Sequence, residues 1–246
     1  MRLFSYIVLI FLFTSCSKQS AGDCFKSTGA ESTETRYPGT FNEIELYANM
    51  ELTIIKSNEC KVELTGGKNV LKNMSCKVNG SVLSLENLNK CNFVRGYKKK
   101  ITAKIYLPYL KNLINYGVAS IHFDEGFAQD SIKLAAESSG DIYLFGNYDY
   151  IHATSNGNGD LYMNGTCKSL YLYTNGTNYV WAGGLLLTND AFVGTQTLGD
   201  CYINATQLKA FTFSIAKNGN IYYSGSPQTI NDWSPGGAKG KAIQKN

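Results

Sequence analysis

The sequence predicts an all-β protein, a β-solenoid that forms a right-handed parallel β-helix of about six coils of about 20 residues. Two observations carry this prediction: apolar residues alternate with no helical period, and a strand-like segment repeats from residue 113 onward. We expect an N-terminal segment of alternating strands at 37–112, solenoid repeats at 113–230 and a glycine-rich end at 231–246.

The N-terminal segment alternates in the way that half-buried strands do. A break at Ala48-Asn49 separates one run that holds Ile44 and Leu46 from a second that holds Leu52 and Ile54. Asn79-Gly80 then lies between two further alternating runs, which is a strong hairpin signal. We therefore predict strands with a β-hairpin near residue 80, and no capped helix.

Six repeated segments follow, at steps of 19 to 21 residues. The fourth residue of each is here called the pivot, and the pivots are Ile121, Ile142, Leu161, Val180, Cys201 and Ile221. Ten residues before five of these pivots lies a second column: Ile132, Ile151, Leu170, Ala191 and Phe211. The constant offset indicates two short strands per repeat, so each repeat forms one coil. Coils then stack at the ~4.8 Å strand spacing, with right-handed crossovers.

Several blocks of the chain, in this order, resemble the putative auto-transporter adhesin, head GIN domain family. They are Asp23–Phe25, Phe41–Ile44, Gly67–Leu71, Asn89–Arg95, the Ser-Gly-Asp-type turns before the pivots, and Gly225–Pro227. The resemblance covers about residues 23–245 and departs at the fourth repeat, where Thr177-Asn-Tyr replaces Ser-Gly-Asp. It implies a β-helix-like domain on an exported, often lipid-anchored protein.

The residue after each pivot must face outward. This column reads His122, Tyr143, Tyr162, Trp181, Tyr202 and Tyr222. Its five successive aromatic residues, Tyr143 to Tyr222, are a candidate binding face, because rings held rigidly on a sheet can contact a polysaccharide at little entropic cost. The alternative is that the rings only stabilise neighbouring strands.

Other polar groups have weaker functional interpretations. Asp141, Asp160 and Asp200 precede their pivots and are better explained as turn caps than as a Ca²⁺ site, since Tyr179 interrupts the column. The two histidines, His122 and His152, fall on different columns, so we expect no metal site. The basic run at 95–100 favours a solvated loop over a site for anionic glycans or a lipid surface.

The N-terminus carries the features of a lipoprotein signal peptide at residues 1–15. An 11-residue apolar run ends at Phe13, and small residues then precede Cys16, the expected lipidated residue. Residues 16–36 would be the lipidated tether. An ordinary secretory signal cut near Ser15 or Ala21 is the alternative. The interpretation places the protein outside the cytoplasm, on a membrane surface of the cell envelope. No acidic residue follows Cys16 immediately, so the residues there do not specify the membrane, and we expect the outer membrane of a Gram-negative bacterium.

Six further cysteines remain in that oxidising compartment. Four lie in the first part of the chain, and we expect Cys24 to pair with Cys91 and Cys60 with Cys76. Cys167 and Cys201 are expected to stay unpaired, because aligned positions two coils apart exceed disulfide reach.

No nucleophile elbow, zinc-protease motif or phosphate loop occurs, so we predict a non-enzymatic protein without cofactor or metal. The net charge of +4 gives no argument for nucleic-acid binding. Asp130-Ser131-Ile132 resembles a short bacterial O-glycosylation motif at Ser131. The predicted function is an adhesin-like envelope protein that binds a glycan or envelope protein through the aromatic column. The alternatives are a purely structural lipoprotein and a polysaccharide-active enzyme.

Overall fold

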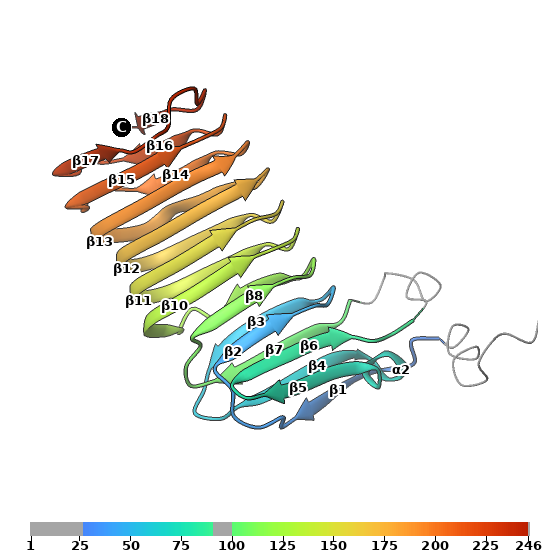
Figure 1. Ribbon diagram of the computed structural model, residues 1–246. Coiled ribbons are helices and arrows are strands. Elements are labelled where there is room, and N and C mark those ends of the chain that lie inside the picture. The colour runs from blue at the N-terminus through green and yellow to red at the C-terminus, as the bar shows by residue number, and fades with distance from the viewer. Residues whose placement is uncertain (1–26, 91–99, 246) are drawn as a thin grey trace, which may run out of the picture.

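The computed structural model describes residues 27–90 and 100–245 as a β-solenoid of stacked parallel coils, which confirms the predicted fold class. The coils follow one axis from the N-terminal to the C-terminal end of the molecule (Figure 1). In chain order the strands are β1 (Glu31–Arg36), β2 (Glu43–Leu46), β3 (Glu51–Lys56), β4 (Lys61–Gly67), β5 (Met74–Asn79), β6 (Val82–Asn87), β7 (Thr102–Leu107), β8 (Asn112–Asn115), β9 (Ser120–Phe123), β10 (Ala128–Ala136), β11 (Ile142–Ser155), β12 (Leu161–Gly176), β13 (Val180–Thr197), β14 (Cys201–Asn204), β15 (Ala210–Ile215), β16 (Ile221–Ser224), β17 (Thr229–Asp232) and β18 (Ala242–Lys245).

Each coil has two sides, because the long strands β11, β12 and β13 bend in the middle. Their first halves join β9, β14, β16 and β18 in what we call the ladder side. Their second halves join β8, β10, β15 and β17 in the second side. All six pivots pair in register along the ladder side and are buried. The second column pairs in register on the second side, as predicted.

The bend between the two sides depends on glycine. Gly146 and Gly165 pair with each other and have φ of 142° and 114°, a region that other residues rarely adopt. A Cβ atom on Gly165 would also overlap the carbonyl oxygen of Gly146. The turn glycines before the pivots have a different role: at Gly159, a Cβ atom would collide with the Gly140 carbonyl of the adjacent coil.

The 21-residue step from Val180 to Cys201 has a local cause in β13. Its register against β12 shifts between Tyr162 and Asn164 and again between Cys167 and Ser169. At the first shift, Gly183 is the extra residue, because Asn164 pairs with Gly184. These bulges lengthen the coil that begins at Val180 without breaking the stack.

The parallel stack begins before the repeats, in the segment expected only to alternate. Strand β2 lies between β6 and β8, and β3 lies between β7 and β9, all in parallel register. The first coil in the chain is thus inserted between two later ones, as the blue strands among green ones show (Figure 1). The expected hairpin is present as β5–β6, with Gly80 at φ 60° in its turn.

Antiparallel strands cover the N-terminal end of the stack. Strand β1 pairs with β4, β4 pairs with β7, and β5 pairs with β6. A four-residue helix, α2 (Lys68–Leu71), follows β4 and was not predicted. At the other end, β17 and β18 add a further coil from the glycine-rich segment, pairing in parallel with β15 and β16. No helix in the described part of the chain is long and apolar enough to cross a membrane.

Candidate binding site on the aromatic ladder

The predicted outward column exists as a continuous stack of rings, here called the aromatic ladder: His122, Tyr143, Tyr162, Trp181, Tyr202 and Tyr222. Its members pair in register across β9, β11, β12, β13, β14 and β16. Neighbouring ring centroids lie 4.4, 4.5, 6.3, 4.5 and 5.2 Å apart, with interplanar angles between 3° and 21°. The strand register therefore places the rings face to face.

Face-to-face stacking limits what a ligand can reach. A ring between two parallel neighbours at about 4.5 Å has both faces covered and presents only its edge to solvent. At the C-terminal end, the Lys245 ammonium lies 4.7 Å from the Tyr222 ring centroid and covers that face too. Most of the ladder is thus arranged to stabilise adjacent coils, which is the structural alternative for these rings.

The ladder is continuous, but its widest ring-to-ring spacing lies at its centre. The Tyr162 and Trp181 centroids are 6.3 Å apart although the rings are nearly parallel, so these two rings overlap less than the other neighbours do. Tyr179 also stacks on Trp181, with its ring centroid 6.0 Å away. Trp181 is 39% exposed. A hollow of about 360 Å³ opens here, lined by Tyr162, Asn164, Trp181, Gly183, Gly184 and Tyr202. The bulge residue Gly183 carries no side chain to fill this space, so a ligand can approach the rings.

The aspartates beside the ladder cap the turns, in agreement with the preferred interpretation. The Asp160 main-chain N–H donates to Asp141 Oδ1, and the Tyr179 N–H donates to Asp160 Oδ1, both at 2.8 Å. The Asn220 N–H donates to Asp200 Oδ1 at the same distance. Each carboxylate thus satisfies a main-chain donor of the next coil. The described residues contain no group of three or more His, Cys, Asp or Glu side chains that could hold a metal ion.

The second carboxylate oxygens point toward the rings. Asp160 Oδ2 accepts from the Tyr162 hydroxyl at 3.4 Å and from Trp181 Nε1 at 3.5 Å. Burial together with the Asp160 charge raises the pKa of Tyr162 to about 12. Burial and Asp141 likewise raise the pKa of Tyr143. Both phenols stay protonated at neutral pH, and the Tyr162 hydroxyl, which lines the hollow, donates to the Asp160 carboxylate beside it.

A second, shorter aromatic column was missed by the sequence reasoning. On the second side, the ring centroids of His152 and Tyr171 lie 4.6 Å apart, and those of Tyr171 and Phe192 lie 5.1 Å apart. These residues follow members of the second column, as the ladder residues follow the pivots, so the same rule would have found them. His152 pairs with Lys133 and Tyr171 and does not meet His122, as expected.

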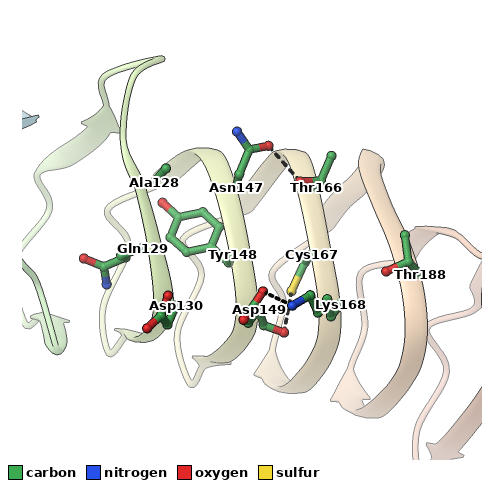
Figure 2. A pocket seen from close by; sticks show the side chains of 10 residues that line it. All are labelled: Ala128, Gln129, Asp130, Asn147, Tyr148, Asp149, Thr166, Cys167, Lys168 and Thr188. Carbon is green, nitrogen blue, oxygen red and sulfur yellow. Dashed lines mark hydrogen bonds and ion pairs between the residues drawn. The ribbon is translucent and has the colours of Figure 1, made fainter.

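A separate hollow of about 500 Å³ lies at the bends of β11 and β12 (Figure 2). Its polar groups already have partners. Lys168 pairs with Asp149 at 2.7 Å, and the Thr166 hydroxyl donates to Asn147 Oδ1 at 2.7 Å. The Cys167 thiol donates to the Ser169 carbonyl, and burial raises its pKa to about 11. This hollow therefore leaves few polar groups in need of a ligand.

The predicted disulfide between Cys60 and Cys76 is wrong, because both thiols are free. Cys60 precedes β4 and donates to the Phe41 carbonyl at 3.7 Å, whereas Cys76 lies on β5 beside Arg36. Strand β5 pairs with β6, and β4 pairs with β1 and β7, so the two cysteines are held by different strand neighbours. Cys167 and Cys201 are buried and free, as predicted.

Several predicted features lie outside the described residues: the signal peptide, Cys16, Cys24, Cys91 and most of the basic run. Of that run, Lys100 is described, and it pairs with Glu51 at 2.6 Å. Ser131 faces outward on β10, half-buried, with its hydroxyl 3.3 Å from that of Tyr109. Its glycosylation stays a prediction.

Comparison with known proteins decides the family. The family model described as putative auto-transporter adhesin, head GIN domain matches residues 40–227. The chain belongs to this family. Membership of this adhesin family indicates a protein of the cell surface or envelope. No curated protein matches the chain.

Solved structures share the fold of this head GIN domain chain. A putative adhesin from Bacteroides fragilis is 22% identical, with a TM-score of 0.79 over 88% of this chain and 97% of that one. A putative lipid binding protein from Parabacteroides distasonis is 16% identical, with a TM-score of 0.69 over 89% and 98%. A putative adhesin from the same species is 18% identical, with a TM-score of 0.61 over 88% and 98%. The family and these neighbours are named for adhesion or lipid binding and not as enzymes.

Proposed function

We propose that this protein is a lipid-anchored adhesin of the cell envelope that binds a neutral glycan at the centre of its aromatic ladder. Cys16 would carry the lipid in the outer membrane, and the solenoid would present the ladder side to the surroundings. The observation that carries the proposal is the hollow at Trp181, where the stack of rings opens and the bulge at Gly183 leaves space.

The chemistry of this hollow suits a sugar. The offset of Tyr162 and Trp181 exposes flat apolar surface, against which the C–H face of a sugar ring can pack. Asp160 Oδ2 and the Asn164 side chain lie at its border and can bond sugar hydroxyls. The Asp160 carboxylate disfavours an anionic ligand at the same place, so the proposal is for a neutral saccharide.

A structural role is the second candidate, and one observation favours it. Outside the central offset, the rings cover one another at 4.4 to 5.2 Å and leave little face for a ligand. An envelope protein whose ladder only holds its coils together would have this arrangement as well. The two candidates differ in whether loss of the central rings removes binding or only stability.

The decisive experiment compares two matched double variants of the full chain, purified in detergent, on a glycan array. Tyr162→Ala/Trp181→Ala removes the rings of the hollow, while Tyr171→Ala/Phe192→Ala removes two stacked rings from the same two strands on the second side. We expect a glycan signal that falls at least about tenfold in the first variant and less than about twofold in the second. Equal losses, or no glycan bound by the unmodified chain, would leave the structural role.

The anchor has its own test. Replacing Cys16 by Ala should move the protein from the membrane fraction to the soluble fraction and abolish incorporation of a labelled fatty acid, because the lipid is the proposed attachment. Cys60→Ala serves as the matched control, since its free thiol lies in the folded region. Membrane retention of the Cys16 variant would refute the anchor without bearing on the ladder.

A further inference from the structure

A second hollow, of about 360 Å³, lies on the second side where the inserted N-terminal coil meets the repeats. It is separate from the ladder. Its lining residues come from β2, β8, β10 and β11 and the chain just before β8, and they are Glu43, Lys111, Asn112, Ser131, Ile132, Lys133, Tyr150 and His152. Four of them, Glu43, Asn112, Lys133 and His152, form one outward column that is aligned across adjacent strands.

The charges in this hollow favour an anionic ligand. Lys111 Nζ lies 3.8 Å from Glu43 Oε1, so one ammonium is partly compensated. Lys133 is exposed and has no ion pair within the described part of the chain. Burial and the Lys133 charge lower the pKa of His152, which keeps the imidazole neutral at pH 7 and able to hydrogen-bond. Two ammonium groups thus face a single carboxylate.

A buried acceptor in the same hollow lacks a donor. Asn112 Oδ1 is buried and has no hydrogen-bond partner among the described residues. Buried polar atoms are almost always paired, and an unpaired one lowers stability unless something else satisfies it. Asn112 lies directly between Glu43 and Lys133 in the column. A ligand hydroxyl at this position would supply the missing donor.

An aromatic ring completes the site. Tyr150 is 40% exposed and stands beside Ser131 in the parallel register of β10 and β11. The Ser131 hydroxyl lines the hollow and provides a further polar contact, with the Tyr109 hydroxyl 3.3 Å away as its neighbour outside the lining. The hollow therefore combines cationic groups, an acceptor without a donor, hydroxyls and an accessible ring within one small volume.

We propose that this hollow binds an acidic sugar residue, with its anionic group at Lys133 and Lys111, a hydroxyl donating to Asn112 Oδ1, and its ring against Tyr150. A single acidic sugar offers all three features in one rigid unit that suits a volume of this size. An acidic peptide carries charge and N–H donors but no rigid hydroxylated ring to place on Tyr150. The site is thus complementary to the ladder hollow, which favours a neutral saccharide.

The test is isothermal titration of the full chain in detergent with a panel of uronate, sialylated and sulfated oligosaccharides. A methyl-esterified uronate of the same length is the uncharged counterpart. We expect at least one acidic oligosaccharide to bind and esterification to abolish the binding. No binding across the panel, equal binding of the esterified sugar, or equal binding of an oligoglutamate would overturn the proposal.

Variants locate the binding. Lys133→Ala should weaken it about tenfold, whereas Lys168→Ala, which removes the same charge at the bend, should change it less than twofold. Asn112→Leu should weaken binding while raising the melting temperature, because it removes an unsatisfied buried acceptor. Equal effects of the two lysine variants, or unchanged binding in Asn112→Leu, would overturn the assignment. The Tyr162→Ala/Trp181→Ala variant should keep this binding, so failure of the ladder proposal is distinguishable from failure of this one.

Discussion

The outward columns on the two sides of the solenoid stand on the same coils, yet the ladder is aromatic throughout, whereas the second-side column is only partly aromatic. The aromatic ladder repeats one kind of side chain, and its rings lie parallel within 21°. The second-side column changes from Glu43 and Lys133 to His152, Tyr171 and Phe192, with a tilt of 44° between the His152 and Tyr171 rings. Aromatic side chains in register stack on one another. In the mixed column, the Lys133 ammonium has no ion pair and Asn112 Oδ1 has no hydrogen-bond donor among the described residues. A column of stacked rings therefore stabilises the coils, and we expect ligands to bind where the rings are offset or where the side chains differ in kind.

The largest effect should come from the bend that both columns share. Gly165→Ala places a Cβ atom against the Gly146 carbonyl at a φ of 114°, and we expect a loss of about 3 kcal/mol or more in unfolding free energy. Gly183→Ala, in open space on the next strand, should stay within about 0.5 kcal/mol. Urea unfolding measures both. Similar stabilities for the two variants would show that the bend does not hold the sides together.

The next largest effect is the loss of stability when rings are removed, which should differ between the two columns. Tyr162→Ala/Trp181→Ala removes four ring contacts, including that of Trp181 with Tyr179, whereas Tyr171→Ala/Phe192→Ala removes three. The ladder pair should lose about 2–3 kcal/mol and the second-side pair about 1–2, because two of the second-side contacts are tilted by 44° and 47°. Thermal unfolding of both variants checks the order. The reverse order would contradict the view that uniform stacking stabilises more.

A smaller effect concerns the turn caps beside the ladder. Asp160→Ala removes the acceptor of the Tyr179 N–H and should cost about 1 kcal/mol, while Asp160→Asn keeps an oxygen there and should cost less. Asp190→Ala is the control on the second side, because that exposed carboxylate accepts mainly from side chains, including the Ser169 hydroxyl. Its unfolding free energy should change by less than about 0.5 kcal/mol. A larger loss at Asp190 than at Asp160 would mean that capping of the Tyr179 N–H is not what makes Asp160 stabilising.

The smallest effect is one of pH. The pKa of Tyr162 is about 12 in the folded chain against 10.0 for a free phenol, so its contribution to stability is present below pH 10 and lost as the pH rises to 12. Asp160→Asn should shift the ionisation of Tyr162 to lower pH. Ultraviolet titration of the phenols, with Tyr162→Phe to assign the signal, measures this. An unchanged titration would mean that the Asp160 charge does not contribute to the raised pKa of Tyr162.

The sequence predicted the features that repetition and turn chemistry determine, namely the stacked coils, the ladder and the hairpin at Gly80. One rule, the residue after the pivot, located the whole ladder, because the step length and the alternation of a strand together define the register. The rule could not predict the pairing of β2 with β8 or of β3 with β9, because these partners lie far along the chain and β2 and β3 do not belong to the repeats. The site around Asn112 depends on that insertion and was therefore invisible. The wrong pairing of Cys60 with Cys76 came from closeness in sequence, which does not determine strand neighbours.

The insertion of β2 and β3 also constrains the order in which the chain can fold. Both strands pair with partners that are synthesised later, up to Phe123 in β9. The coil cannot close as the chain emerges, so the N-terminal region must wait for residues about 70 positions away. Contacts between residues so far apart in the sequence are slow to form. The later coils, whose contacts join residues about one repeat apart, can assemble first. Folding is thus expected to nucleate in the repeats and to proceed backward toward the N-terminal end.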